Sequence, residues 1–331
     1  MSWRASARTA GRIGLAALAA VTAMPWAAAA ADDAQPRFAM HSRLADQTLL
    51  LDVARAGPRL VAVGHFGHVL LSDDDGGSWR QSDAVPTQVT LTEVFFADAQ
   101  HGWAVGHDAV VLATRDGGAN WQVQHSDREA EAPLLSVWFE NSQHGIAVGA
   151  FGMLIETSDG GAHWETSQIS SDADEDLHLN HVFGGPDGSV FVAAEAGTVF
   201  RSDDGGSHWK RLSVPYEGSF WSGIALPDET VVVVGMRGHV FWSTDRGESW
   251  TSASTGSEAS LSEVALLRDG SLIAVGSGGA VMRSRDGGRS FRARIEPGRR
   301  SLAAVAEGDD GRLLGFGEAG VSVLRAADEP D

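Results

Sequence analysis

Residues 91–124 read LTEVFFADAQHGWAVGHDAVVLATRDGGANWQVQ. The stretch alternates short runs of β-branched, aromatic and other apolar residues with two turns, GHDA and RDGG. Such runs, bounded by glycine and aspartate, are typical of β-strands joined by tight turns, because both residues tolerate the backbone angles that these turns need. We therefore predict four strands in this unit, at residues 91–97, 102–106, 110–114 and 120–125.

The RDGG turn belongs to a motif that occurs six times, which we call the Asp box. Each copy reads Ser or Thr, any residue, Asp, any residue, Gly, two further residues and an aromatic residue. Successive aromatic residues lie 41 to 45 positions apart, a period that matches the four-stranded blades of β-propellers. The box aspartates are Asp74, Asp116, Asp159, Asp204, Asp245 and Asp286, and the aromatic residues are Trp79, Trp121, Trp164, Trp209, Trp250 and Phe291.

Two further repeats occur in seven copies, one more than the Asp box. One begins each unit with Leu or Trp, followed three residues later by Val or Ile. The other is a glycine-rich turn whose central pairs are His65/Phe66, His107/Asp108, Ala150/Phe151, Glu195/Ala196, Met236/Arg237, Ser277/Gly278 and Glu318/Ala319. The repeats predict an all-β fold, a seven-bladed β-propeller of four-stranded antiparallel blades. The predicted blades span residues 48–83, 91–126, 134–170, 178–214, 219–256, 261–296 and 301–326.

The seventh unit stops after three predicted strands. Residues 36–42 (PRFAMHS) stand just before the first unit, and we predict that they form the missing fourth strand. Pairing this strand with the last blade would close the ring and remove an exposed sheet edge. Residues 32–331 would then be one domain, because seven units account for nearly all of this length.

The N-terminus has the pattern of a secretory signal peptide. Arg4, Arg8 and Arg12 precede the uncharged stretch 13–23, and alanines fill positions 27–31. A charged start, a short apolar region and small residues at the cleavage site are the features of such a leader. We predict a signal peptide at 1–31 and export to the periplasm.

Composition restricts the partners of the chain. The formal net charge is -19, and removal of the three leader arginines would change it to -22. Such acidity disfavours nucleic acid, because phosphates would be repelled. The chain has no cysteine, so it cannot be a lipoprotein, and beyond the leader no apolar run is long enough to span a membrane. We expect neither a metal nor a cofactor.

The Asp boxes are predicted to be structural. An aspartate at a hairpin bend can accept backbone N–H hydrogen bonds, and the following aromatic residue can pack on a neighbouring hairpin. Binding is instead expected where turns converge on one face. We predict that Phe66, Phe151, Met236 and Arg237 lie on one face and contact a protein. Polar residues before the valine of each inner strand are expected to ring the channel: Asp52, Glu93, Ser136, His181, Gly223, Glu263 and Ala304.

The residues of two units carry a family resemblance. Residues 91–124 closely resemble a repeat of the photosystem II stability/assembly factor family, and HGIAVGAFGMLIETSDGGAHW, which ends at Trp164, repeats the pattern. The resemblance implies a lumenal seven-bladed propeller without enzymatic activity that binds assembly intermediates of membrane proteins. We accordingly expect a monomer whose partner is a protein, either a membrane protein or an envelope complex.

The alternative is a secreted Asp-box glycosidase of the sialidase type. That chemistry needs an arginine cluster, a tyrosine nucleophile with a glutamate partner, and an aspartic acid. The only tyrosine is Tyr216, in the link between the fourth and fifth units. We therefore expect no enzymatic activity.

Overall fold

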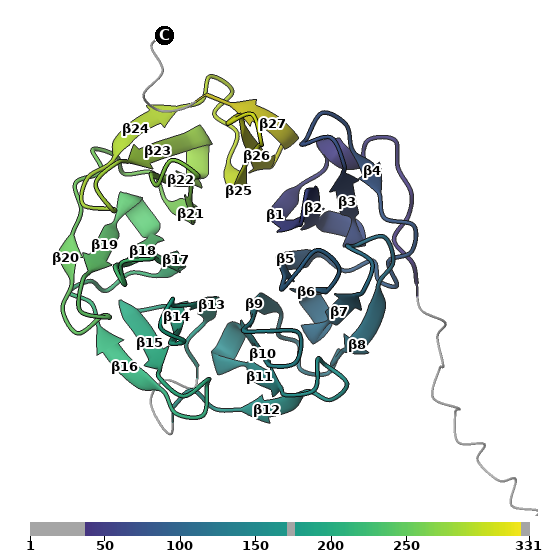
Figure 1. The fold of residues 1–331 in the computed structure, drawn as a ribbon, viewed down its shortest axis with the longest axis horizontal. Helices are drawn as coiled ribbons and strands as arrows, with labels where there is room; N and C mark the ends of the chain where they lie inside the picture. The colour runs from purple at the N-terminus through teal and green to yellow at the C-terminus, as the bar shows by residue number, and fades with distance from the viewer. Residues whose placement is uncertain (1–36, 171–175, 326–331) are drawn as a thin grey trace, which may run out of the picture. The chain divides into compact units, whose positions relative to one another are not determined.

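The computed structural model describes residues 37–170 and 176–325. The predicted signal peptide at 1–31 lies outside these residues. Seven antiparallel sheets stand around a central axis as the blades of a propeller (Figure 1). The predicted all-β, seven-bladed fold is therefore confirmed.

The strands follow the sequence repeats closely. In the second unit they begin and end within two residues of the prediction. Blade 1 contains β1 (Leu50–Ala56), β2 (Arg59–Gly64), β3 (Val69–Ser72) and β4 (Arg80–Gln81). Blade 2 contains β5 (Leu91–Phe96), β6 (Gly102–Gly106), β7 (Val111–Thr114) and β8 (Gln122–His125). Blade 3 contains β9 (Leu134–Phe139), β10 (Gly145–Gly149), β11 (Leu154–Thr157) and β12 (Glu165–Ser167).

The remaining blades have the same order of strands from the axis outward. Blade 4 contains β13 (Leu179–Gly184), β14 (Val190–Ala194), β15 (Thr198–Ser202) and β16 (Lys210–Ser213). Blade 5 contains β17 (Phe220–Ala225), β18 (Val231–Gly235), β19 (Val240–Ser243) and β20 (Thr251–Ser252). Blade 6 contains β21 (Leu261–Leu266), β22 (Leu272–Gly276), β23 (Ala280–Ser284) and β24 (Arg292–Ile295). Blade 7 contains β25 (Leu302–Glu307), β26 (Leu313–Gly317) and β27 (Gly320–Leu324).

Short 3-10 turns complete the described structure. One precedes the first strand, and five connect the second and third strands of a blade. They are η1 (Ala45–Gln47), η2 (His65–Gly67), η3 (His107–Ala109), η4 (Ala150–Gly152), η5 (Met236–Gly238) and η6 (Ser277–Gly279).

The second strand of each blade is the most apolar. In β6, β10, β14, β18, β22 and β26 every residue is buried. Both faces of these strands are covered by neighbouring blades, so a continuous apolar run replaces the usual alternation. The core is therefore a series of seven contacts between adjacent blades.

The prediction of a closing strand at residues 36–42 is wrong. Residues 37–42 form no strand, and among the described residues the seventh sheet has only three strands. The segment lies on blade 1, where Ala39 donates its N–H to the Val85 carbonyl at 2.9 Å and Ser42 donates to Gln81 Oε1 at 2.6 Å. Ala39 also packs on the core between blades 1 and 2. These contacts hold the segment outside β4 (Figure 1).

The ring closes by side-chain contacts between the first and last blades. Leu50 and Leu60 of blade 1 pack with Leu314 and Phe316 of blade 7. Arg55 adds a polar contact, because its Nη2 donates to the Glu307 carbonyl at 2.6 Å. The same atom donates to Asp75 Oδ1 of the first Asp box at 2.8 Å. Closure therefore needs no shared strand.

Candidate functional site

The turns between second and third strands share an unusual backbone. In six of the seven blades two consecutive residues of this turn have positive φ, as in a type I′ turn, whose central positions favour Gly, Asn and Asp. The sequence predicted left-handed angles at the glycines, but the preceding residue adopts them too. These turn-tip residues are Phe66 (φ 60°), Asp108 (58°), Phe151 (55°), Ala196 (53°), Arg237 (55°) and Gly278 (62°).

Three of the tips carry large side chains. Phe66 and Phe151 are 50% and 61% exposed, and Arg237 is exposed. A left-handed residue other than glycine costs about 1–2 kcal/mol, and exposed apolar surface gains nothing from burial. These residues therefore combine backbone strain with solvent exposure, and such strain is concentrated at functional sites.

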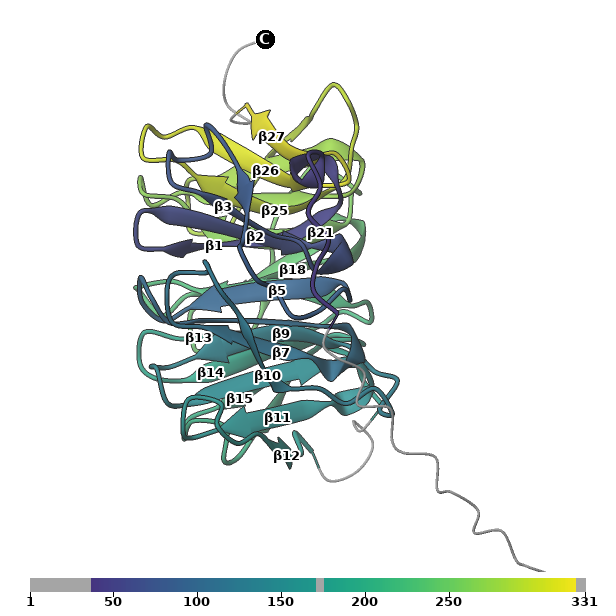
Figure 2. The same cartoon turned by 90° about the vertical axis from the view of Figure 1, so that its right-hand side faces the viewer.

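The predicted binding residues lie at one face of the propeller, which we call the turn face. The same pair of strands is joined at the same end in each antiparallel blade, so η2, η4 and η5 lie at the same face of the ring, which Figure 2 shows from the side. Phe66 stacks on His65 with ring centroids 4.5 Å apart, and Phe151 meets His178 edge-on at 4.9 Å. Met236 is half-buried, so it presents less surface than the sequence suggested.

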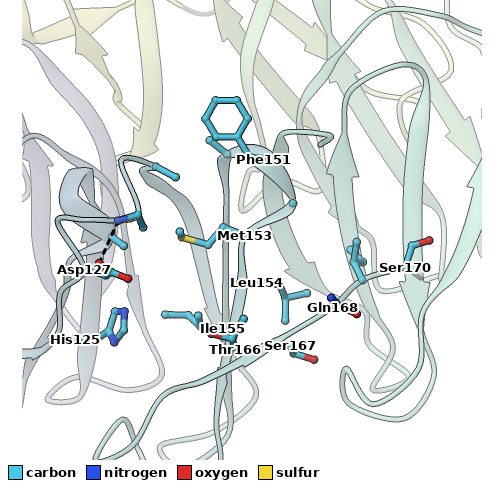
Figure 3. A pocket seen from close by; sticks show the side chains of 16 residues that line it. His125, Asp127, Phe151, Met153, Leu154, Ile155, Thr166, Ser167, Gln168 and Ser170 are labelled. Atoms are coloured by element: carbon cyan, nitrogen blue, oxygen red, sulfur yellow. Dashed lines mark hydrogen bonds between the residues drawn. The ribbon is translucent and has the colours of Figure 1, made fainter. Parts of the chain in front are cut away.

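A groove opens beside Phe151 on the turn face. It has a volume of about 390 Å³ and lies between blade 2 and blade 3. Figure 3 shows Phe151 at one end, with Met153 and Ile155 below it and His125 on the opposite wall. Burial lowers the pKa of His125, which favours its neutral form. Sequence reasoning missed Met153, Ile155 and His125. The position of Ile155 is apolar in the other blades too, and neither Met153 nor His125 belongs to a repeated motif, so none of the three carries a sequence signal of a site.

Polar contacts between adjacent blades lie along the channel wall. In six of the seven blades a side chain near the start of the inner strand accepts a hydrogen bond from a backbone N–H of the next blade, and we call these contacts the inter-blade latches. The pairs are Asp52 with Val94 (2.8 Å), Glu93 with Val137 (3.0 Å), Ser136 with Val182 (2.9 Å), His181 with Gly223 (3.2 Å), Ser222 with Val264 (3.4 Å) and Glu263 with Val305 (2.6 Å).

The structure corrects one residue in the predicted ring of channel residues. In blade 5 the polar position is Ser222 rather than Gly223, because Phe220 takes the buried place that Leu has elsewhere. The repeat that begins each unit with Leu or Trp predicts Trp221 at this place, which is one residue out of register with the structure. In blade 7 the position is Ala304, which has no acceptor, so the junction between blades 7 and 1 lacks a latch of this kind.

The latch residues surround a channel cavity of about 130 Å³. Burial and the neighbouring Glu93 raise the pKa of Asp52 to about 7. Burial and Asp52 likewise raise the pKa of Glu263 well above its usual value. His181 Nε2 lies 3.5 Å from Glu93 Oε1, which fits a ring that accepts from Gly223 at Nδ1. Within residues 37–170 and 176–325, no cluster of three or more His, Asp or Glu has a metal-binding arrangement.

The six Asp boxes share one set of contacts at the opposite face. In the second box, Asp116 Oδ1 accepts from the Asn120 N–H at 2.9 Å and from Thr114 Oγ1 at 2.8 Å. The other five aspartates accept a backbone N–H four residues ahead and a hydroxyl two residues behind in the same way. Hydrogen bonds lower the pKa of Asp74, Asp159, Asp204 and Asp245 to about 2. These are the contacts expected of a hairpin clip.

Tyr216 lies in a different environment from a nucleophile. Its hydroxyl donates to the Met236 carbonyl at 3.2 Å, and its ring contacts Phe220, His239 and Phe241. Burial raises the pKa of Tyr216, whereas an activated nucleophile needs a lowered pKa or an adjacent base. These contacts of Tyr216 are those of a packing residue.

The described part of the chain, 37–170 with 176–325, contains no helix with the length and hydropathy needed to cross a membrane.

Known proteins with a related sequence match over short stretches. Photosystem II assembly protein Ycf48 of Thermosynechococcus vestitus is 42% identical over 48 residues, which are 13% of this chain and 14% of the relative. Photosystem II stability/assembly factor HCF136, chloroplastic, of Cyanidioschyzon merolae is 40% identical over 62 residues, 18% of this chain and 14% of the relative. The chain thus aligns with about a seventh of the length of these relatives.

Solved structures share the fold over most of the chain. A structure of YCF48 bound to D1 peptide superposes with a TM-score of 0.67 at 17% identity, covering 85% of this chain and 94% of the other. YCF48 from Cyanidioschyzon merolae superposes with a TM-score of 0.65 at 17% identity, covering 88% of this chain and 99% of the other. A streptogramin B lyase superposes with a TM-score of 0.69 at 9% identity, covering 87% of this chain and 97% of the other. At these identities the likeness shows the fold alone.

The family assignment rests on a sequence model that covers most of the propeller. The model of the Photosynthesis system II assembly factor YCF48 matches residues 71–137 and 124–294. These matches run from the end of blade 1 to the outer strand of blade 6. The chain belongs to the family of the photosystem II assembly factor YCF48.

Proposed function

We propose that this protein is an exported, non-enzymatic scaffold that binds a protein partner and assists the assembly or stability of a membrane-associated complex. The observation that carries the proposal is the pair Phe66 and Phe151, which are strained and exposed on one face. Family membership supports an assembly role. Export is supported by the pattern of residues 1–31, and the partner is a membrane protein or an envelope complex.

The chemistry of the turn face suits a protein partner. Exposed aromatic side chains supply large contact area at low entropic cost. Phe66 and Phe151 lie on blades 1 and 3, and Arg237 on blade 5, so a partner touching all three would span half of the ring. The groove next to Phe151 offers a place for an apolar side chain of that partner.

A set of glycine substitutions separates binding from folding. Phe66→Gly and Phe151→Gly remove the aromatic rings and relieve left-handed strain, so the fold should keep its stability. Asp108→Gly and Ala196→Gly are matched controls at small tips with the same backbone. We expect crosslinking in the native envelope, followed by mass spectrometry, to recover the partner with the control variants and lose it with the phenylalanine variants. Equal recovery with all four would show that the turn face is not the binding surface.

A direct assay tests the absence of enzymatic activity. The purified protein should leave a fluorogenic sialoside intact. Hydrolysis that disappears in Tyr216→Phe would instead identify the chain as a glycosidase. Hydrolysis that persists in that variant would point to a contaminating enzyme.

The Asp boxes belong to the fold in this proposal. Each box aspartate ties one hairpin, and each box aromatic packs between its own blade and the one before it. All six are therefore proposed to hold blades together rather than to contact the partner.

A further inference from the structure

Most of the links that lead from one blade to the next place a β-branched side chain on the following blade. In four links a buried valine, isoleucine or threonine stands five or six residues after the box aromatic residue, and we call it the cover residue. Three of the four share an apolar cluster with a residue in the third strand of the next blade: Val85 with Leu112, Ile169 with Phe200 and Val214 with Phe241. The fourth, Thr255, donates its hydroxyl to the Gly238 carbonyl at 3.0 Å.

The link from blade 2 to blade 3 has no cover residue. The corresponding positions are Ser126 and Asp127, and both are exposed. The apolar cluster between these blades contains Ile155, the counterpart of Leu112, but no counterpart of Val85. The groove beside Phe151 opens at this place, with Ile155 in its wall (Figure 3). The groove is therefore the space that a link fills in four other blades.

The link from blade 6 to blade 7 shows the same relation. It has Glu296 at the position of the cover residue, and Glu296 lines a hollow of about 130 Å³ on blade 7. The groove on blade 3 is the larger of the two, at about 390 Å³. A missing cover residue therefore goes with an open space on the next blade in both links.

The filled sites show what form of chain fits the groove. In blades 2 and 6 the residue before the cover residue forms a parallel bridge with the next box, Ala84 with Asn120 and Ser254 with Ser290. Its carbonyl accepts the N–H of the box aromatic residue, from Trp121 at 3.0 Å and from Phe291 at 2.8 Å. The corresponding Trp164 N–H has no backbone hydrogen bond within residues 37–170 and 176–325. The occupant that fits blade 3 is thus an extended segment with a β-branched side chain.

The rest of this chain does not supply such a segment. Beyond the predicted leader, the sequence outside the described residues is DDAQP at 32–36, SDADE at 171–175 and AADEPD at 326–331. None of these stretches contains valine, isoleucine or threonine. The occupant therefore comes from another molecule.

The charge of the groove favours a basic occupant. Asp127 is the one charged side chain among the described residues that line it, and its Oδ1 accepts the Glu129 N–H at 3.0 Å. Burial lowers the pKa of His125, so this wall residue adds no positive charge near neutral pH. The nearby Arg128 has its Nε 3.6 Å from the Asp108 carboxylate. A lysine or arginine on the occupant would complement Asp127.

We propose that the groove on blade 3 binds an extended basic segment of a partner polypeptide. A valine or isoleucine of that segment takes the place of the missing cover residue over Ile155, and its backbone runs beside Trp164 as residues 83–85 run beside Trp121. The inference rests on the proposed function, since Phe151 stands at one end of the groove (Figure 3), and it adds the chemistry of the partner segment.

Peptide binding tests the groove directly. The probe is a fluorescein-labelled heptapeptide of alternating lysine and isoleucine, and a second peptide with alanine in place of isoleucine has the same charge. Thr166→Trp covers the groove from an exposed position that pairs with Ile155. Val123→Trp is the matched control, because Val123 is the exposed partner of Leu112 in blade 2, where Val85 already fills the site.

A charge substitution separates the groove from general attraction to an acidic protein. Met153→Glu places a carboxylate in the groove, and Val123→Glu adds the same charge outside it. General attraction of the basic peptide would become stronger in both variants, whereas binding in the groove becomes weaker in Met153→Glu alone. Thr166→Trp changes only an exposed side chain, so it tests the groove even if Met153→Glu lowers the stability of the half-buried site.

We expect the Kd, measured by fluorescence anisotropy, to rise at least about tenfold in Thr166→Trp and Met153→Glu and with the alanine peptide, because the buried isoleucine is lost. It should stay the same in Val123→Trp. Asp127→Asn keeps the acceptor for the Glu129 N–H and should raise the Kd about threefold, as expected for one exposed ion pair. Equal binding by Thr166→Trp and the native protein, or equal binding of the alanine peptide, would overturn the proposal.

Two further results would also decide the matter. A concentration-dependent dimer that Thr166→Trp abolishes would assign the groove to a second copy of the chain and overturn the proposal, although the net charge of -19 opposes such a dimer. Absence of peptide binding, with loss of the native partner in Phe66→Gly, would refute the groove and leave the turn face standing. Peptide binding in the groove, with equal recovery of the partner by all glycine variants, would refute the turn face alone.

Discussion

Six junctions between blades differ from the junction that closes the ring. Each of the six carries a latch, in which a channel side chain accepts a backbone N–H of the next blade. The closing junction has Ala304 at that position. It relies on apolar packing around Phe316 and on Arg55, which joins blade 1 to the Glu307 carbonyl.

The closing junction uses a different set of specific contacts. Asp75 of blade 1 accepts the Asp309 N–H at its carboxylate, and its carbonyl accepts from Arg312 Nη2 at 3.4 Å. Consecutive blades are also joined by the chain itself, whereas blades 1 and 7 come from opposite ends of the propeller. We expect local opening to begin there, because these two blades, unlike consecutive ones, are held together by non-covalent contacts alone.

The largest loss of stability is expected when the apolar contact at the closing junction is removed. Phe316→Ala removes a fully buried ring that meets Trp79 edge-on at 5.6 Å, and such substitutions cost about 3–5 kcal/mol. Phe191→Ala in β14 is a control with similar burial inside blade 4. Hydrogen exchange should show blades 1 and 7 opening first in Phe316→Ala only. Similar exchange patterns in both variants would remove the distinction between the junctions.

The next largest loss of stability is expected from a substitution in the Asp box. Asp116→Ala deletes the acceptor of three hydrogen bonds, from Asn120 N–H, Asn120 Nδ2 and Thr114 Oγ1. We expect a loss of about 2 kcal/mol, seen as a melting temperature lower by several degrees. Asp116→Asn keeps an acceptor and should lose less. An unchanged melting temperature in Asp116→Ala would refute the structural role of the Asp-box aspartate.

The latch at Asp52 should make stability depend on pH. Its pKa is raised to about 7 in the folded protein from 3.8, so the charged form is disfavoured by folding. The contribution of Asp52 to stability is therefore greatest below about pH 4 and falls as pH rises toward 7. Asp52→Asn keeps an acceptor for the Val94 N–H and should stabilise the protein by about 1–2 kcal/mol at pH 8, less than the full pKa shift implies, because Asp52 is only half-buried. At pH 4 the two proteins should melt alike; a gain at both pH values would contradict the assigned pKa.

The smallest change in stability is expected when a latch is added at the closing junction. Ala304→Ser places a hydroxyl where the other blades have an acceptor. By the register of the other latches it would face the Val53 N–H of blade 1, which now bonds to the adjacent Asp52 carboxylate. One added hydrogen bond contributes about 1 kcal/mol. Slower amide exchange at Val53, with a slightly higher melting temperature, would show that closure was limited by the missing acceptor. A lower melting temperature would mean that the buried Ala304 site has no room for the hydroxyl.

The repeated features were predictable because each is coded locally. The Asp box, the glycine turn and the inner-strand apolar pair recur in fixed order, so seven blades and their strands follow from periodicity. Phe66, Phe151 and Arg237 could be assigned to turn tips for the same reason. Their left-handed angles could not, since the adjacent glycines alone seemed sufficient for the turn.

The sequence by itself determined the number of blades, their strands and the single propeller that they form. Only the tertiary structure decided the path of residues 37–42, the partners of the latches and the three-stranded form that blade 7 has within residues 37–170 and 176–325. The reason is physical: these features depend on contacts between distant residues, such as Arg55 and Glu307, which are 252 positions apart. A local pattern cannot specify such pairs, because it is the same whichever distant residue completes the contact.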